Sequence, residues 1–227
     1  MYSKLILLFI FFGLLILLSS FRKDKRKKMI FFGDSITAAG TGRTGYITVL
    51  KNMLQKEGID NYKLVNAGVS GNKAHDLYLR VEEDVIHQSP DIVVLFIGVN
   101  DVWHKKTHGT DTDADQFEKL YRSTIRKLQA ANAKVVLCTP AVIGEKNNNN
   151  NEQDEDLNEY AAIIKNIGND LQLPVCDLRM LFQNYIREYN TDDANSGILT
   201  TDGVHLNDAG NRLVAEAIWE KMKVVLL

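Results

Sequence analysis

Short apolar runs alternate with helix-patterned segments along most of the chain, and this alternation constrains the fold more than any other feature. The runs lie at residues 29–32, 63–66, 91–97, 134–138 and 174–177. Each is short enough for a buried strand, and the segments between them carry apolar residues at helical spacing. Strands that alternate with helices pair in parallel through right-handed crossovers. The sequence therefore predicts an α/β fold, a three-layer α/β/α sandwich with a parallel sheet, in one domain at 29–227.

Two connections lack either pattern. Trp103 to Asp115 is polar, and we expect a loop over the carboxyl edge of the sheet. Asn147 to Asn151 is a run of five asparagines, the one low-complexity stretch, and we expect a solvated loop there. A helix is predicted after it, at Glu152 to Leu171.

The first 28 residues stand apart from the rest of the sequence. Leu5 to Phe21 is a run of seventeen residues without charge, long enough to cross a bilayer as a helix. Six basic residues follow it within 22–28, against a single Lys4 in front. Basic flanks tend to stay on the cytoplasmic side, so we expect an uncleaved membrane anchor with the domain at the cytoplasmic face. The alternative is export, with a signal peptide cleaved near Ser19 and Ser20.

Charge argues against one class of partner, and the two cysteines have a simple structural interpretation. Residues 29–227 hold 20 Lys and Arg against 28 Asp and Glu. This acidic balance argues against a nucleic-acid partner, which needs clustered basic residues. Cys138 and Cys176 each lie in a predicted strand, so we expect two buried free thiols.

The first strand ends in a serine. The sequence MIFFGDSITA places Gly33, Asp34 and Ser35 directly after the apolar run 29–32. Open α/β sheets place their ligand sites at the carboxyl ends of strands. Ser35 is therefore a candidate nucleophile, although a single serine at this position also suits a turn or a helix cap.

A serine nucleophile needs a base, a group that orients the base, and donors for the oxyanion. Asp202 lies three residues before His205, close enough for its carboxylate to accept a hydrogen bond from the imidazole. The backbone N–H groups of Ser35 and Gly71 and the side-chain amide of Asn100 are candidate oxyanion donors at strand ends. Taken singly, each of these residues also fits a structural role in a turn, loop or cap.

Four blocks together resemble the ordered motifs of the SGNH (GDSL-type) hydrolase family. They are GDSIT at 33–37, NAGVSG at 66–71, GVND at 98–101 and DGVH at 202–205. The resemblance implies that Ser35 is the nucleophile, His205 the base and Asp202 its orienting carboxylate. It also implies oxyanion donors at Ser35, Gly71 and Asn100; Gly68 competes with Gly71, which the motif spacing favours.

The same resemblance implies a fold and an activity. The fold would be flavodoxin-like with a five-stranded parallel sheet. The activity would be that of a serine esterase without metal or cofactor, acting on a small-molecule or lipid ester. Lysophospholipid, short-chain acyl and acetyl-sugar esters all remain open, and the sequence does not predict the oligomeric state.

Three other interpretations are weaker. Gly40 to Gly45 reads G-x-G-x-x-G, the pattern of a dinucleotide-binding oxidoreductase, but seven residues separate it from the first strand and Asn66 stands where an acid is needed. A membrane-tethered, inactive binding module is the second. The third is a metal site at residues 104–113, where His104, His108, Asp111 and Asp113 lie in a segment without a fixed geometry; we expect no metal, and a minor role at the substrate mouth.

Overall fold

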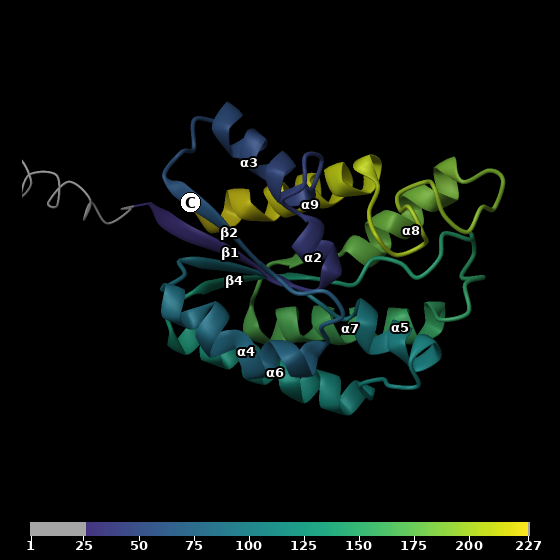
Figure 1. Ribbon diagram of the computed structural model, residues 1–227, viewed down its shortest axis with the longest axis horizontal. Coiled ribbons are helices and arrows are strands. Elements are labelled where there is room, and N and C mark those ends of the chain that lie inside the picture. Colours follow the sequence, from purple (N-terminus) through teal and green to yellow (C-terminus); the bar gives the residue numbers. More distant parts are fainter. Residues whose placement is uncertain (1–25, 227) are drawn as a thin grey trace, which may run out of the picture.

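The structure is a computed structural model that describes residues 26–226, and it holds a five-stranded parallel sheet between two helical layers (Figure 1). The strands are β1 (Lys27–Gly33), β2 (Tyr62–Gly68), β3 (Ile92–Phe96), β4 (Lys134–Cys138) and β5 (Val175–Cys176). The helices are α2 (Ser35–Ala39), α3 (Tyr46–Lys56), α4 (Ala74–Asp84), α5 (Val99–Thr107), α6 (Ala114–Ala130), α7 (Asp154–Leu171), α8 (Leu178–Tyr189) and α9 (Asp208–Leu226). A 3₁₀ turn, η1 (Ile86–Gln88), precedes β3.

The strand order is β2-β1-β3-β4-β5, with every neighbouring pair parallel. The chain leaves β1 toward β2 on one side and returns to β3 on the other, so the connections diverge at the carboxyl ends of β1 and β3. Such a switch point leaves a crevice where open α/β sheets bind ligands. The predicted fold, a parallel sheet of five strands between helices, is confirmed.

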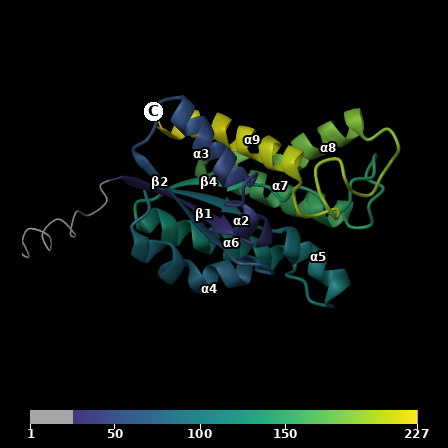
Figure 2. The same ribbon diagram turned by 45° about the horizontal axis from the view of Figure 1, so that its top comes forward.

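Alternate residues of β1 enter two separate cores. Met29 and Phe31 pack with α3, α8 and α9, whereas Ile30 and Phe32 pack with α4, α6 and α7. The two views show these groups of helices on opposite faces of the sheet (Figures 1 and 2). A central strand covered on both faces has no polar side, which explains why the strand sequences are apolar without interruption.

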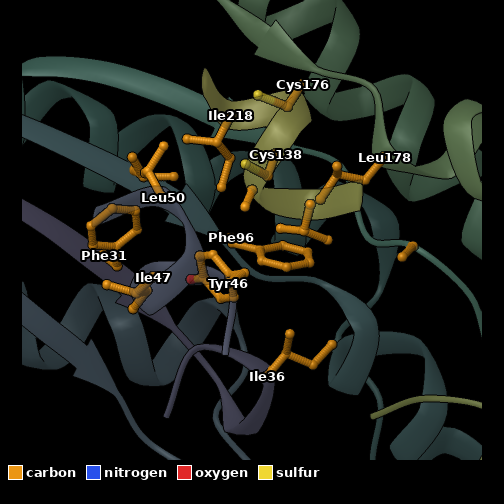
Figure 3. Close-up of a cluster of buried hydrophobic side chains, with 14 of the residues drawn as sticks. Phe31, Ile36, Tyr46, Ile47, Leu50, Phe96, Cys138, Cys176, Leu178 and Ile218 are labelled. Carbon is orange, nitrogen blue, oxygen red and sulfur yellow. The ribbon is translucent and has the colours of Figure 1, made fainter. Parts of the chain in front are cut away.

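Tyr46 connects the first of these cores to the segment after β1. Its ring packs edge-on against Phe31 and Phe96, with centroids 5.8 and 6.2 Å away (Figure 3). Its hydroxyl donates to Oγ1 of Thr37 at 3.0 Å. Buried aromatic pairs of this kind are rigid, so the short helix α2 is held in place from within the core.

The structure corrects the predicted loop at Trp103 to Asp115. Helix α5 runs from Val99 to Thr107, and α6 begins at Ala114. Only the first four residues of α5, Val99 to Val102, are buried. The rest of the helix is mostly polar and has no apolar periodicity, so the sequence shows no helical pattern there. The two cysteines are free and buried, as predicted.

The asparagine run is only partly the solvated loop that the sequence suggests. Residues 148–150 are exposed, but Asn147 and Asn151 are partly buried and bonded. The Asn151 carboxamide oxygen accepts from the backbone N–H of Lys146 at 3.1 Å, and its Nδ2 donates to Asp154 at 2.9 Å. Asn147 donates through Nδ2 to the carbonyl of Asn190 at 2.7 Å. The run therefore folds against the start of α7 and the end of α8.

The predicted membrane segment, Leu5 to Phe21, lies outside the described residues. Within 26–226, no helix combines the length and the apolar character needed to cross a bilayer. The anchor and its orientation therefore remain predictions.

Candidate active site

Ser35 is the first residue of α2 and lies at the carboxyl end of β1. Asp34 caps this helix, because its carboxylate accepts from the backbone N–H of Ile36 at 2.9 Å. A Cβ atom at Gly33 would lie 2.2 Å from the carbonyl oxygen of Phe96. Glycine at this position lets β1 approach β3 closely and sets Ser35 at the switch point.

His205 joins Ser35 to Asp202 by two hydrogen bonds. The Ser35 hydroxyl lies 3.0 Å from Nε2 of His205, although the residues are 170 positions apart. The other ring nitrogen, Nδ1, lies 2.7 Å from the Asp202 carboxylate. With the proton on Nδ1, Nε2 is free to accept the serine proton. The structure thus brings together the three residues predicted as nucleophile, base and orienting carboxylate.

Asp202 is held in its ionised form by local hydrogen bonds. Partial burial pushes its pKa up, but bonds from the His205 ring and from the backbone N–H groups of His205 and Val204 outweigh this effect. The net result is a pKa below the ordinary value. A carboxylate that stays charged keeps the imidazole in one tautomer and stabilises its protonated form.

The turn that carries Asp202 and His205 rests on Glu145. The buried Glu145 carboxylate accepts from the consecutive backbone N–H groups of Ile198, Leu199 and Thr200 at 2.7–2.8 Å. The backbone N–H of the neighbouring Gly144 donates a hydrogen bond to the carbonyl of Gly203 at 2.8 Å. No sequence pattern points to Glu145, because its partners are backbone groups more than fifty residues away along the chain.

The predicted oxyanion donors lie just beyond the carboxyl ends of β1, β2 and β3, Ser35 and Asn100 in the first turns of α2 and α5 and Gly71 in the loop before α4. Asn100 is buried near the start of α5, and its Nδ2 donates one hydrogen to the carbonyl of Asn72 at 3.0 Å. A carboxamide carries two such hydrogens, so one remains for another acceptor. Gly71 has φ +80°, and a Cβ there would meet no atom within 4 Å. Gly68 instead packs against α2, since its Cβ would lie 2.2 Å from the nitrogen of Ala38.

Two further side chains, Arg80 and Asp101, fix the segments that carry these donors, and neither role was predicted from the sequence. Arg80, on α4, donates to the carbonyls of Gly33 and Ala67 at 2.9 Å and to the side chain of Asn72 at 2.6 Å. Asp101 accepts from the backbone N–H of Ala74 at 3.1 Å. The ends of β1 and β2 and the loop before α4 are therefore tied together.

Burial raises the pKa of two carboxyl groups beside the site. The pKa of Asp34 rises to about 7, mainly through desolvation, with a smaller contribution from Asp101; bonding to Ile36 and the charge of His205 oppose the shift. The pKa of Asp101 rises to about 6 for the same main reason, opposed by bonds from Thr112 and Ala74. Both groups titrate near neutral pH.

The glycine-rich segment Gly40 to Gly45 is a structural turn, so the structure does not favour the dinucleotide interpretation. Helix α2 occupies the place after β1 where a phosphate loop would begin. A Cβ at Gly45 would lie 2.3 Å from the carbonyl of Gly40, so these glycines allow the chain to pack against itself. Asn66, where a dinucleotide site would need an acid, instead donates to the carbonyls of Thr37 and Ala38 in α2 at 2.8 and 3.1 Å.

His104 and His108 lie one turn apart on and just after α5. Their rings are 4.4 Å apart, and the His104 pKa is lowered by partial burial and by the nearby His108. Among residues 26–226, no group of three or more His, Cys, Asp or Glu side chains is arranged to hold a metal ion. Trp103, between this pair and the triad, has its ring edge-on to His205 at 6.1 Å.

Several known proteins are similar to this chain in sequence and in fold. The sequence pattern of the GDSL-like lipase/acylhydrolase family matches residues 31–213. An acetylxylan esterase of Geobacillus stearothermophilus is 30% identical over 84% of this chain and 91% of its own length. A GDSL esterase/lipase of Arabidopsis thaliana is 25% identical over 87% of this chain and 86% of its own.

Solved structures agree with these relatives. The crystal structure of an acetyl xylan esterase named AlAXEase superposes with a TM-score of 0.83 at 55% identity, covering 85% of this chain and 98% of the other. The acetylxylan esterase Axe2 of Geobacillus stearothermophilus gives a TM-score of 0.76 at 28% identity, covering 88% and 96%. The chain therefore belongs to the GDSL-like lipase/acylhydrolase family and is a carboxylic ester hydrolase.

Proposed function

We propose that the protein is a serine esterase that removes acetyl groups from sugars through an acyl-enzyme on Ser35. The observation that carries the mechanism is the unbroken chain of hydrogen bonds from Ser35 through His205 to Asp202. A hydroxyl in contact with a base that is itself oriented by a carboxylate is the arrangement needed to activate serine near neutral pH.

The reaction would proceed in two halves. Ser35 Oγ attacks the ester carbonyl carbon while its proton passes to Nε2 of His205. The N–H groups of Ser35 and Gly71 and the amide of Asn100 stabilise the oxyanion. Collapse of this intermediate breaks the bond to the alcohol, which leaves with the proton from His205. Water, deprotonated by His205, then attacks the acyl-serine; the bond to Ser35 Oγ breaks, Oγ takes the proton back from His205, and the acid leaves.

Two observations support a sugar as the alcohol. Two relatives are named as acetylxylan esterases, and the one with a solved structure at 55% identity covers 85% of this chain. A hollow of about 350 Å³ also borders the triad, and its lining includes Asp202, Trp103 and the polar side chains of Asn150 and Asn195. Because His205 returns its proton to the leaving alcohol, the alcohol must lie within reach of Nε2 of His205, and the hollow meets the triad at Asp202. Amide groups beside an aromatic ring suit a hydroxylated ring better than a lipid chain.

The mechanism is tested with p-nitrophenyl acetate and an acetylated xylo-oligosaccharide as substrates. We expect Ser35→Ala to lower kcat by at least about 1,000-fold on both, because the nucleophile is lost. Ser123→Ala is the matched control and should keep full activity, because the Ser123 hydroxyl donates to the carbonyl of Lys119 on its own helix, α6. A fluorophosphonate should label the wild type at Ser35. Hydrolysis that survives Ser35→Ala would contradict the mechanism.

The substrate class is tested separately. We expect p-nitrophenyl acetate to be hydrolysed faster than p-nitrophenyl octanoate, and acetylated xylo-oligosaccharides to release acetate. Preference for octanoate or for a lysophospholipid, with Ser35 still essential, would keep the mechanism and overturn the sugar assignment.

A further inference from the structure

A second hollow lies beyond the one that borders the triad. It has a volume of about 260 Å³ and lies between the asparagine run and α8. We call it the distal hollow and the first one the triad-side hollow. Both are lined by Gly144, Lys146 and Asn151, so they adjoin one another. The connection before α7 and the one after α8 both lie at the end of the sheet opposite the start of β1 (Figures 1 and 2). The triad-side hollow meets the triad at Asp202, so the residues shared by the two hollows mark the path from the triad to the distal hollow.

The lining of the distal hollow is polar and hydrogen-bonding. Asn148, Asn149 and Gln183 contribute carboxamides, and Lys146 and Arg187 contribute cationic donors. Each carboxamide can both donate and accept, as a sugar hydroxyl can. Small-molecule sites usually enclose about 300–1,000 Å³. The distal hollow is therefore suited to one part of a larger substrate, and an acyl chain of a lipid would find little apolar surface there.

The walls of the distal hollow are fixed before any ligand binds. The side-chain amides of Gln183 and Asn149 lie 3.0 Å apart, and the Gln183 amide also lies 3.1 Å from the Arg179 guanidinium. The buried Arg179 lies at its base, paired with Asp154 at 2.6 Å and bonded to the carbonyl of Ala141 at 3.0 Å. A site whose side chains are already ordered loses less entropy when a ligand binds.

Asparagine has a conformational role here as well as a chemical one. Asn148 and Asn149 have φ angles of 58° and 57°, in the left-handed region. Asparagine adopts this region more readily than other side chains except glycine. The run can therefore turn sharply at two consecutive positions while still presenting carboxamides at the distal hollow.

We propose that the distal hollow is a second sugar-binding subsite, which takes a ring of the substrate's saccharide chain remote from the ester. The proposal rests on the function proposed above for its substrate class. It predicts that the enzyme acts on acetylated oligosaccharides in preference to acetylated monosaccharides.

The test compares kcat/KM for acetylated xylotriose with that for an acetylated methyl xyloside. Asn148→Gly removes the carboxamide but keeps the left-handed backbone, so it does not add strain. Asn132→Gly is the matched control, since Asn132 is also left-handed, with φ 62°, but lies at the turn before β4 at the other end of the sheet. We expect Asn148→Gly to lower the ratio of the two kcat/KM values by about three- to tenfold, the loss typical of one hydrogen bond. The control should leave the ratio unchanged.

A binding measurement separates this proposal from the esterase mechanism. Unacetylated xylotriose is titrated into Ser35→Ala protein and into Ser35→Ala/Asn148→Gly protein, followed by calorimetry. We expect a three- to tenfold weaker association for the double variant, by the same hydrogen-bond argument. Equal affinities, or a wild type without preference for the trisaccharide ester, would overturn the subsite. Loss of the subsite would leave hydrolysis of p-nitrophenyl acetate by Ser35 untouched, whereas activity in Ser35→Ala would overturn the mechanism alone.

Discussion

Oε1 of Glu145 lies 2.7 Å from the backbone nitrogen of Leu199, inside the protein and three residues before the Asp202 carboxylate. The same carboxylate also accepts hydrogen bonds from the backbone N–H groups of Ile198 and Thr200. Hydrogen bonds to an ionised acceptor are stronger than those between neutral groups. Glu145 therefore acts as a positioning residue that fixes the start of the turn on which the base and its orienting carboxylate lie.

Glu145→Gln should lower kcat by about tenfold or more on p-nitrophenyl acetate and leave KM within about twofold. The glutamine Nε2 would face backbone donors in a buried place, which costs about 1–3 kcal/mol and loosens the turn. A small displacement of His205 reduces the rate without altering how the small ester binds. Glu57→Gln, at an exposed glutamate just after α3, is the control. If Glu145→Gln keeps the wild-type kcat, the turn does not depend on this carboxylate.

Asn100→Ala should reduce kcat by about 100- to 1,000-fold, the usual effect of removing one oxyanion donor, with a much smaller effect on KM. The loss appears in kcat because the oxyanion forms only in the transition state. Because the Asn100 side chain also bonds to the carbonyl of Asn72, thermal unfolding of the variant must be measured alongside. A folded variant with unchanged kcat would remove Asn100 from the oxyanion hole.

Gly68→Ala and Gly71→Ala should separate a packing role from a catalytic one. At Gly68 a methyl group would collide with the backbone of Ala38, so we expect a loss of more than about 3 kcal/mol in the free energy of unfolding. At Gly71 space is open but φ is +80°, so we expect a cost of only about 1 kcal/mol. We also expect Gly71→Ala to lower kcat, because the N–H at this position is a proposed donor. Denaturant unfolding and steady-state kinetics on both variants test this, and equal stability losses would contradict it.

The sequence alone predicted the elements that rest on strong apolar patterns. Strand Lys134–Cys138 was predicted to the residue, and the helix predicted at Glu152 to Leu171 ends where α7 ends, since both segments have clear apolar patterns. The placement of Ser35 followed from a general rule, that sites lie at the carboxyl ends of parallel strands. No local pattern connects Ser35 with His205; their pairing was predicted from the need of a serine nucleophile for an oriented base and from the resemblance to a family with these four motifs.

What the sequence missed depends on contacts distant along the chain. Arg80 resembles an ordinary surface residue of an amphipathic helix, yet it bonds to the ends of β1 and β2. Glu145 lies in a segment without any pattern and bonds to backbone atoms, which carry no sequence signal. Helix α5 was not predicted, because its polar second half has no buried face and therefore no apolar pattern. In each case tertiary structure, rather than local preference, determines the role of the residue.

The buried carboxyl of Asp34 should make the protein less stable as the pH rises. Its folded pKa of about 7 lies above the ordinary value of 3.8, so between these values the folded state holds a proton that the unfolded state has lost. The unfolded state binds fewer protons in this range, and the free energy of unfolding therefore falls as pH increases. From pH 5 to pH 8, Asp34 contributes a loss of about 2–3 kcal/mol. Asp101, with a pKa of about 6, adds a smaller loss of the same sign.

Urea unfolding of the wild type and of Asp34→Asn at pH 5 and pH 8 measures this effect. Asparagine keeps an oxygen that can accept from Ile36, but it cannot ionise, so the variant should lose about 2–3 kcal/mol less than the wild type over this interval. Asp60→Asn, at an exposed carboxylate before β2, should behave as the wild type does. An equal dependence on pH in wild type and Asp34→Asn would mean that Asp34 does not titrate between pH 5 and pH 8 in the folded protein.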